Sequence, residues 1–557
     1  MNNDQNMNPQ SSQDRLWWQR GVVYQIYPRS FLDTTGNGVG DLQGVIDKLD
    51  YLNDGTPESL GIDAIWLNPI FPSPMADFGY DVADYCDIHP LFGDLATFDR
   101  LVAEAHKRGI KIIIDWVPNH SSDQHPWFVE SRSSRDNPKR DWYVWRDPKP
   151  DGGDADRHRL PNNWLSVFGG PAWEWDEVTG QYYLHSFLKD QPDLNWRNPT
   201  VKEAMFDVIR FWLERGVDGF RIDVAHYIMK DPQMRNNPPH PGPKGMLQRP
   251  PREYDKFLHL YDKGHPDVHT VFREFRQLLD AYSAEQPRYS VGEIHIFDWQ
   301  KWASYYGQKL DGLHMPFNFA LLNVAWEAQK VREVVDSLEA AIPPGAWPNY
   351  VLGNHDHWRI ASHYGKAQAR VAAMLLLTLR GIPTLYYGDE IGMTDVPIPP
   401  ERQQDPFGIR EPGFGRDPNR TPMQWDANPN AGFSDVEPWL PVSADYVTRN
   451  VAAQSDNPTS ILNLYRRLLW YRQGSPALFG GSYQPLDADN DDCFVYLRSA
   501  GEERRLVALN FTGDQCSLSV PGQDAGRVAI STLMDREEKV SLSDLQLRSN
   551  EGVIIEL

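Results

Sequence analysis

Gly219-Phe220-Arg221-Ile222-Asp223 is a short, mostly apolar run that ends in a carboxylate. A second run with this character is Tyr289-Ser290-Val291-Gly292-Glu293. When parallel strands alternate with helices, the polar residues that follow the strands gather at one face of the fold. We therefore expect Asp223 and Glu293 to lie at neighbouring strand ends.

Six further runs are likewise short and mostly apolar, and amphipathic stretches such as Phe98 to Arg108 separate several of them. They are Gly21 to Tyr27, Ala64 to Leu67, Ile110 to Asp115, the stretch around Leu313 to Met315, Tyr350 to Leu352, and Pro383 to Tyr387. Strands that alternate with helices are typical of a parallel sheet, and eight such units indicate a closed barrel. The predicted fold class is α/β, a (β/α)8 TIM barrel.

The length of 557 residues exceeds the size of one ordinary core, so additional domains are expected. The segment from Ser121 to Asn195 is polar and too long for a simple βα loop, which predicts an inserted subdomain after the third strand. Short alternating runs near the C-terminus predict an antiparallel β domain. The predicted domains are 1–120 with 196–478, 121–195, and 479–557.

The amino-acid composition restricts which binding partners and which cellular compartment are expected. The formal net charge of −22 argues against nucleic acid and favours an uncharged or cationic ligand. Only Cys86, Cys493 and Cys516 occur, and they do not make a disulfide framework. The polar N-terminus does not resemble a signal peptide, and no run is apolar enough to span a bilayer. We expect a cytoplasmic protein without a membrane partner, of undetermined oligomeric state.

Paired carboxylates suit glycoside cleavage, in which one acid attacks the anomeric carbon while the other protonates the departing oxygen. Arg221 and Asp223 are two positions apart on one strand, so they project to the same side. An adjacent guanidinium is expected to lower the pKa of Asp223, whereas apolar neighbours are expected to raise that of Glu293. A purely structural Arg–Asp pair is the alternative for Asp223.

Four sequence motifs, taken together and in this order, resemble those of one known enzyme family. They are Asp115-Trp116-Val117-Pro118-Asn119-His120, Gly219 to Asp223, Val291-Gly292-Glu293 and Asn354-His355-Asp356. The chain resembles the α-amylase family of glycoside hydrolases from about Trp17 to its C-terminus. The segment Gln191-Pro192-Asp193-Leu194-Asn195 resembles the one that marks the oligo-1,6-glucosidase and α-glucosidase branch.

The resemblance implies a role for each matching residue. Asp223 is the nucleophile, Glu293 the acid and base, and Asp356 the third catalytic carboxylate. Residues implied to bind the first sugar are Asp77, Tyr80, His120, Arg221, His355 and Arg420. A pair between Asp77 and Arg420 would close the pocket behind a terminal glucose, which predicts exo action, although Arg416 is close enough in sequence to be the partner instead.

Asp33-Thr34-Thr35-Gly36-Asn37-Gly38-Val39-Gly40-Asp41 places oxygen side chains at alternating positions. This pattern is typical of a hard-cation loop, although the distal Glu of an EF-hand is absent. The resemblance implies Ca²⁺ or Mg²⁺ in a structural role and no organic cofactor. A metal-free glycine-rich turn is the alternative. The predicted ligands are Asp33, Thr35, Asn37, the Val39 carbonyl and Asp41.

We predict a retaining, exo-acting α-glucosidase that acts on small α-glucosides, with possible transfer to an acceptor alcohol or sugar. A transglucosylase or a sucrose or trehalose isomerase would use the same glucosyl-enzyme. A non-catalytic sugar-binding protein would need lost carboxylates. The resemblance associates Val224, next to Asp223, with α-1,6 tolerance, but the surrounding stretch is nearer to α-glucosidases, so linkage preference stays open.

Overall fold

The computed structural model describes residues 15–149, 159–242 and 251–557. Its centre is an eight-stranded parallel sheet in the order β10-β11-β1-β2-β3-β7-β8-β9. The strands are β1 (Val23–Ile26), β2 (Ala64–Leu67), β3 (Lys111–Trp116), β7 (Gly219–Ile222), β8 (Tyr289–Gly292), β9 (Met315–Pro316), β10 (Asn349–Val351) and β11 (Ile382–Tyr386). The predicted eight-stranded barrel is confirmed.

The barrel closes between β9 and β10 through a side chain instead of a backbone ladder. Asn349 Nδ2 donates to the Pro316 carbonyl over 2.6 Å, and Asn349 Oδ1 accepts from the Asn318 amide over 3.0 Å. β9 has two residues, and Pro316 has no amide proton to donate. The buried Asn349 therefore supplies the bonds that short strands leave out.

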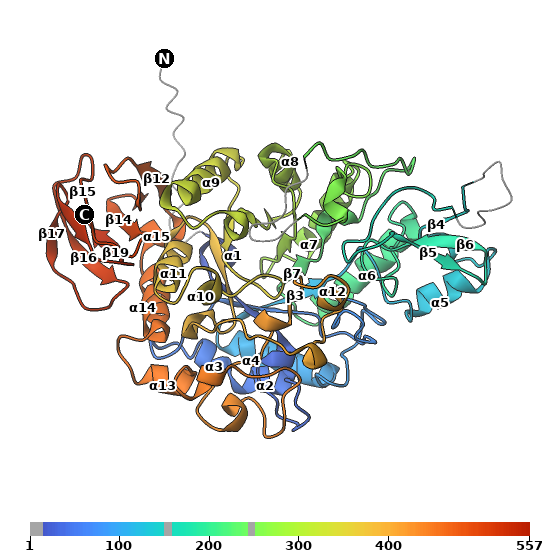
Figure 1. Ribbon diagram of the computed structural model, residues 1–557, viewed down its shortest axis with the longest axis horizontal. Helices are drawn as coiled ribbons and strands as arrows, with labels where there is room; N and C mark the ends of the chain where they lie inside the picture. The colour runs from blue at the N-terminus through green and yellow to red at the C-terminus, as the bar shows by residue number, and fades with distance from the viewer. Residues whose placement is uncertain (1–14, 150–158, 243–250) are drawn as a thin grey trace, which may run out of the picture.

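Helices cover the barrel and connect its strands (Figure 1). The main ones are α4 (Leu95–Lys107), α6 (Pro199–Glu214), α7 (Val268–Ala281), α9 (Ala328–Ala341), α11 (Gln368–Thr378) and α14 (Ile461–Gln473). Shorter ones are α1 (Trp17–Arg20), α2 (Leu42–Asp47), α3 (Leu49–Leu52), α5 (Pro126–Ser133), α8 (Trp299–Ala303), α10 (Ile360–His363), α12 (Pro406–Arg410), α13 (Val451–Ser455) and α15 (Pro476–Gly480). The buried faces of α4 and α7 are apolar, which explains their amphipathic sequence.

An antiparallel three-stranded sheet is inserted between β3 and α6. Its order is β4-β6-β5, with β4 (Trp145–Arg146), β5 (Trp173–Asp176) and β6 (Gln181–Leu184). The insert extends to the side of the molecule opposite the C-terminal sheet (Figure 1). Part of the predicted insert, residues 150–158, lies outside the described residues, as does the polar N-terminus, residues 1–14.

A C-terminal antiparallel β sheet follows the barrel. Its order is β12-β13-β14-β19-β16-β17. The strands are β12 (Ser482–Leu486), β13 (Cys493–Ala500), β14 (Glu503–Asn510), β16 (Ala525–Ser531), β17 (Lys539–Ser541) and β19 (Gly552–Glu556), and β15 (Cys516–Leu518) pairs separately with β18 (Leu545–Leu547). Buried Arg498 joins this sheet to the barrel by donating to the Thr378 carbonyl at the end of α11.

No helix within the described ranges is both long and apolar enough to cross a membrane.

Candidate active site

Two catalytic candidates follow adjacent barrel strands. The Asp223 amide donates to the Trp116 carbonyl over 2.8 Å, and the Glu293 amide donates to the Ile222 carbonyl over 2.9 Å. Each acid therefore extends the hydrogen-bond ladder of its strand by one residue. The expected placement at neighbouring strand ends, those of β7 and β8, is confirmed.

One guanidinium joins three carboxylates from three strands. Arg221 Nη1 donates to Asp115 Oδ1 and to Asp223 Oδ1, each over 2.9 Å. Its Nη2 donates to Glu293 Oε2 over 2.7 Å. The Arg221 side chain is 2% exposed, so this charge is screened very little by solvent. Arg221 thus lies beneath the acids and orients them.

Glu293 accepts more hydrogen bonds than Asp223 does. Besides Arg221, the Val224 amide donates to Glu293 Oε2 over 3.0 Å, and His295 Nε2 lies 2.8 Å from Glu293 Oε1. Val224 has a φ of 35°, a left-handed conformation that is unusual for a β-branched residue. This strained turn directs the Val224 amide at Glu293.

This unequal bonding shifts the pKa values of the two acids in opposite directions. Burial raises the pKa of Asp223 well above its usual range, because one bond from Arg221 and its charge do not offset desolvation and the nearby charge of Glu293. Burial also opposes ionisation of Glu293, but the charge of Arg221 and the bond to His295 outweigh it, so the pKa of Glu293 lies below its usual range. The predicted directions, Asp223 lowered and Glu293 raised, are wrong for this arrangement.

Asp356 lies at the same site with three cationic or polar neighbours. Arg420 Nη2 donates to Asp356 Oδ1 over 2.9 Å, and Arg416 Nη1 donates to the same atom over 3.1 Å. His355 Nε2 lies 3.2 Å from Asp356 Oδ2. Burial is outweighed by His355 and the two arginines, which hold the pKa of Asp356 well below its usual range. Asp356 is therefore an anion whose oxygens can accept hydrogen bonds from sugar hydroxyls.

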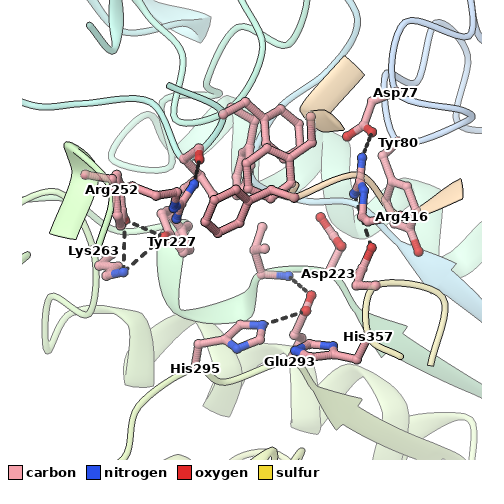
Figure 2. A pocket seen from close by; sticks show the side chains of 18 of the residues that line it. Asp77, Tyr80, Asp223, Tyr227, Arg252, Lys263, Glu293, His295, His357 and Arg416 are labelled. Atoms are coloured by element: carbon pink, nitrogen blue, oxygen red, sulfur yellow. Dashed lines mark hydrogen bonds and ion pairs between the residues drawn. The ribbon is translucent and has the colours of Figure 1, made fainter. Parts of the chain in front are cut away.

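The predicted pair between Asp77 and Arg420 is wrong. Asp77 Oδ1 accepts from Arg416 Nη2 over 2.8 Å (Figure 2). Arg416 is held in this position by Asp405, whose two oxygens accept from Arg416 Nη2 and Nε over 2.7 and 3.0 Å. Arg420 is turned instead toward the His355 carbonyl, to which its Nε donates over 2.8 Å. The alternative partner, Arg416, makes this pair.

The two predicted histidines differ in position. His120 lines the cavity, and Gln191 links it to Asp77 through bonds of 3.2 and 3.1 Å. His355 lies behind Tyr80, with its ring stacked on the phenol at 5.5 Å and Nε2 2.7 Å from the hydroxyl. Burial lowers the pKa of His120 to about 4 and that of His355 to about 3, so both are neutral near pH 7.

A cavity of about 360 Å³ brings these groups together. Of the predicted residues, Asp77, Tyr80, His120, Asp223, Glu293 and Asp356 line it, whereas Arg221, His355 and Arg420 support them from behind. Lining residues that sequence reasoning did not identify include Phe168, Arg252, Lys263, His295, Phe407 and Phe414, whereas Arg416 was named only as the alternative partner of Asp77. Only His295 carried a sequence signal, because it follows Glu293 by two positions.

Aromatic rings form one wall of the cavity. The rings of Phe168 and Phe407 are 4.9 Å apart, and those of Phe407 and Phe414 are 5.6 Å apart. Arg252 lies over both Phe407 and Phe414 at 5.1 Å. On the same side, Lys263 Nζ donates to the hydroxyls of Tyr227 and Tyr254, each over 3.0 Å (Figure 2). This wall is apolar with two cations at its edge.

The predicted metal loop is held by its own hydrogen bonds. Asp33 Oδ1 accepts from the Thr35 amide over 2.9 Å, and Asp33 Oδ2 accepts from the Gly38 amide over 2.7 Å. Asp41 caps α2 through the Gly44 amide, over 2.8 Å. The oxygen-only set suits Ca²⁺ or Mg²⁺ in chemistry, with two carboxylates at most. Among the described residues, no group of three or more His, Cys, Asp or Glu side chains could hold a metal ion. The metal stays a prediction.

Known proteins match the chain over almost its whole length. The catalytic domain of α-amylase matches residues 25–481. A probable α-glucosidase of Rhizobium meliloti is 42% identical over 545 residues, which cover 95% of this chain and 96% of that protein. An oligo-1,6-glucosidase of Parageobacillus thermoglucosidasius is 36% identical over 585 residues, which cover 98% and 99%.

Solved structures agree with these relatives. An α-glucosyl transfer enzyme has a TM-score of 0.90 and 41% identity, with 98% of this chain and 100% of that chain covered. An isomaltulose synthase variant from Erwinia rhapontici, solved with its natural substrate sucrose, has a TM-score of 0.85 and 36% identity, with 98% and 99% covered. The chain therefore belongs to the α-amylase family of glycoside hydrolases, as an enzyme of the α-glucosidase type.

Proposed function

We propose that the enzyme is a retaining, exo-acting α-glucosidase that releases α-glucose from the non-reducing end of short α-glucosides. The observation that carries this proposal is the pair between Arg416 and Asp77 at 2.8 Å, in the cavity that also holds Asp223 and Glu293. A salt bridge at this end of the cavity supports binding of a chain terminus over the middle of a polymer.

The proposed donor site combines a stacking surface with hydroxyl acceptors. Tyr80 is 5% exposed and lines the cavity, so its ring offers an apolar face to a sugar. Asp77 and Asp356 are carboxylates, and Arg416 binds both of them. One glucose held between them would present its anomeric carbon to Asp223 and its glycosidic oxygen to Glu293.

In the proposed reaction, Asp223 attacks the anomeric carbon while Glu293 gives its proton to the departing oxygen. The C–O bond breaks, its electrons stay with the leaving alcohol, and a β-glucosyl ester of Asp223 forms. Glu293 then takes a proton from water, which attacks the ester and releases α-glucose. These steps require the proton of the pair on Glu293 and the negative charge on Asp223, which is the reverse of what the free site favours, so a proton has to pass from Asp223 to Glu293 when the glycoside binds.

Transfer to an acceptor is the second candidate, since the same ester can react with an alcohol. The aromatic wall of Phe168, Phe407 and Phe414 favours it, because apolar surface beside the ester binds a carbon-rich acceptor better than water. Relatives with the names α-glucosyl transfer enzyme and isomaltulose synthase support the same alternative.

The test is a substrate panel of maltose, isomaltose, sucrose, trehalose and soluble starch, with products followed by NMR within minutes of mixing. We expect α-glucose as the first product and little activity on starch. Initial β-glucose would exclude the retaining mechanism, and rapid shortening of starch would exclude exo action. New glucosides or sucrose isomers would identify transfer as the main reaction.

A further inference from the structure

His295 is not among the residues so far assigned to catalysis, but it contacts one of them, Glu293. It lies two positions after Glu293 and lines the cavity. Its Nε2 is 2.8 Å from Glu293 Oε1 (Figure 2), and its ring stacks on Phe319 with 4.5 Å between centroids and 9° between planes. The stacking fixes the ring, so the contact with Glu293 is a defined one.

The other oxygen of Glu293 is already used. Glu293 Oε2 accepts from Arg221 Nη2 over 2.7 Å and from the Val224 amide over 3.0 Å. A guanidinium and a backbone amide are donors at every pH of interest, so Oε2 has to accept. A proton on Glu293 must therefore sit on Oε1, the atom that faces His295.

We propose that His295 is a positioning residue for this proton, an inference that rests on the proposed role of Glu293 as acid and base. When Glu293 is protonated, Oε1–H donates to Nε2 of a neutral ring that carries its hydrogen on Nδ1. When Glu293 is ionised, Nε2–H donates to Oε1. An imidazole can do both, because its two nitrogens exchange roles.

The chemical step stays balanced under this proposal. The Oε1–H bond breaks as an O–H bond forms on the leaving oxygen, and Glu293 becomes an anion. The ring then takes a proton from solvent on Nε2 and releases the one on Nδ1, so that Nε2–H donates to Oε1. In the second step, Oε1 takes one proton from the attacking water, the ring exchanges its Nε2 proton for one on Nδ1 through solvent, and the original state returns. The His295 side chain is 32% exposed, so the ring can exchange protons with solvent between the steps.

Several charged or titratable groups surround the pair. Arg221 contacts Glu293 directly, and the charge of Asp356 acts on Glu293 as well. The ring of His226 lies 6.0 Å from that of His295. Lys263 acts on His226 in turn. All of these remain unchanged in a variant of His295 alone, so its effect on the pH profile can be assigned to the contact with Glu293.

The test compares two substrates in His295→Phe and His295→Gln. Maltose has a sugar leaving group that needs a proton, whereas α-glucosyl fluoride needs little help. We expect kcat/KM for maltose to fall about 10- to 100-fold in both variants, which is at most the lower end of the about 100- to 10,000-fold that general acid–base catalysis contributes, because Glu293 itself remains. For the fluoride we expect a fall of less than about threefold, and the pH profile for maltose should shift.

His357→Phe is the matched control. His357 lines the same cavity and stacks on Phe319 at 6.1 Å, and its Nδ1 lies 3.0 Å from Asn354 Oδ1. We expect the ratio between the two substrates to stay at its wild-type value. Circular dichroism checks the folding of each variant, and His295→Gln serves if His295→Phe does not fold. Equal losses on both substrates, or no loss on maltose, would overturn the proposal.

Glu293→Ala separates this proposal from the function it rests on. We expect this variant to lose maltose turnover, to keep formation of the glucosyl-enzyme from the fluoride, and to yield α-glucosyl azide with azide. If it does not, the role of Glu293 is wrong. If it does, and His295→Phe still treats both substrates alike, only the inference about His295 fails.

Discussion

Arg416 Nη2 and Asp77 Oδ1 are 2.8 Å apart, and Nη1 of the same guanidinium is 3.1 Å from Asp356. The Arg416 side chain is 10% exposed, so both contacts lie out of bulk solvent. One arginine therefore fixes the two carboxylates that are proposed to bind sugar hydroxyls. This relationship makes Arg416 the residue on which recognition of a terminal glucose depends.

Arg416→Ala is expected to lower kcat/KM for maltose about 100-fold or more. The variant leaves Asp77 and Asp405 buried without their partner, and breaking a buried pair in this way costs about 3–5 kcal/mol. The melting temperature should fall as well. Arg416→Lys keeps the charge but not the fork of donors, and it should lose less of both.

Arg410 is the control for this prediction, since it lies on the nearby α12 and is exposed. Arg410→Ala should keep wild-type kinetics and melting temperature. Kinetics of Arg416→Ala close to wild type would show that the Asp77 end of the cavity does not bind the substrate.

Asp223→Asn is expected to abolish turnover of maltose while the melting temperature stays the same or rises. Removal of the nucleophile blocks ester formation. Burial raises the pKa of Asp223, so the folded protein favours a neutral side chain there, and an amide of the same shape meets that preference. Turnover near the wild-type rate, or a loss of several degrees in melting temperature, would contradict the prediction.

Asp389→Asn should remove part of the pH dependence of stability. Burial raises the pKa of Asp389 to about 7, against about 3.9 for an unfolded Asp. The folded protein therefore holds an extra proton between about pH 4 and pH 7, and the stability from this group falls as pH rises through that window. Each pKa unit corresponds to about 1.4 kcal/mol, so the variant should gain up to a few kcal/mol relative to wild type above pH 7.

Urea denaturation at pH 5 and pH 8 measures this effect, with exposed Asp435→Asn as the control. Within the described residues, Asp389 Oδ1 has no hydrogen-bond partner that an amide would disturb. An equal change in the free energy of unfolding at both pH values would show that Asp389 is not the titrating group.

Removal of Ca²⁺ and Mg²⁺ is expected to lower the melting temperature by a few degrees, because a ligand that binds only the folded state stabilises it. The loop from Asp33 to Asp41 has neutral side chains at Thr35 and Asn37, which predicts weak binding. Asn37→Asp adds a charge and should recover full stability at lower Ca²⁺. If EDTA changes neither protein, the loop binds no metal.

The barrel could be predicted from the sequence because short, mostly apolar runs alternate with amphipathic stretches, and β2, β7 and β8 each end directly before a polar residue. This pattern is local, so it survives without knowledge of packing. The weakest strand, β9, has two residues, and its connection to β10 depends on the side chain of Asn349. A contact of this kind depends on three-dimensional proximity and leaves no periodic signal.

The site was predictable where residues follow strands and less so elsewhere. Asp223 and Glu293 were placed by strand position. The sequence could not decide between Arg416 and Arg420 as the partner of Asp77, because both lie on one long loop. In the structure, Asp405 holds Arg416 so that it faces Asp77. The pKa values of Asp223 and Glu293 depend on how many N–H groups donate hydrogen bonds to each carboxylate. That number is a property of the folded loops.

Lys230 Nζ lies 2.6 Å from Asp193 Oδ2 and 2.6 Å from Asn119 Oδ1, and its side chain is 5% exposed. These buried contacts join the end of the inserted segment to the barrel loops that follow β3 and β7. A substitution of Lys230 or Asp193 would leave a buried charge without its counter-ion. The loops that carry Phe407, Phe414 and Lys263 instead present rings and a cation to the cavity. Mutational tolerance should therefore be low on the glucose side and high on the acceptor side. To obtain new products from this scaffold, the residues on the acceptor side should be randomised and those on the glucose side left unchanged.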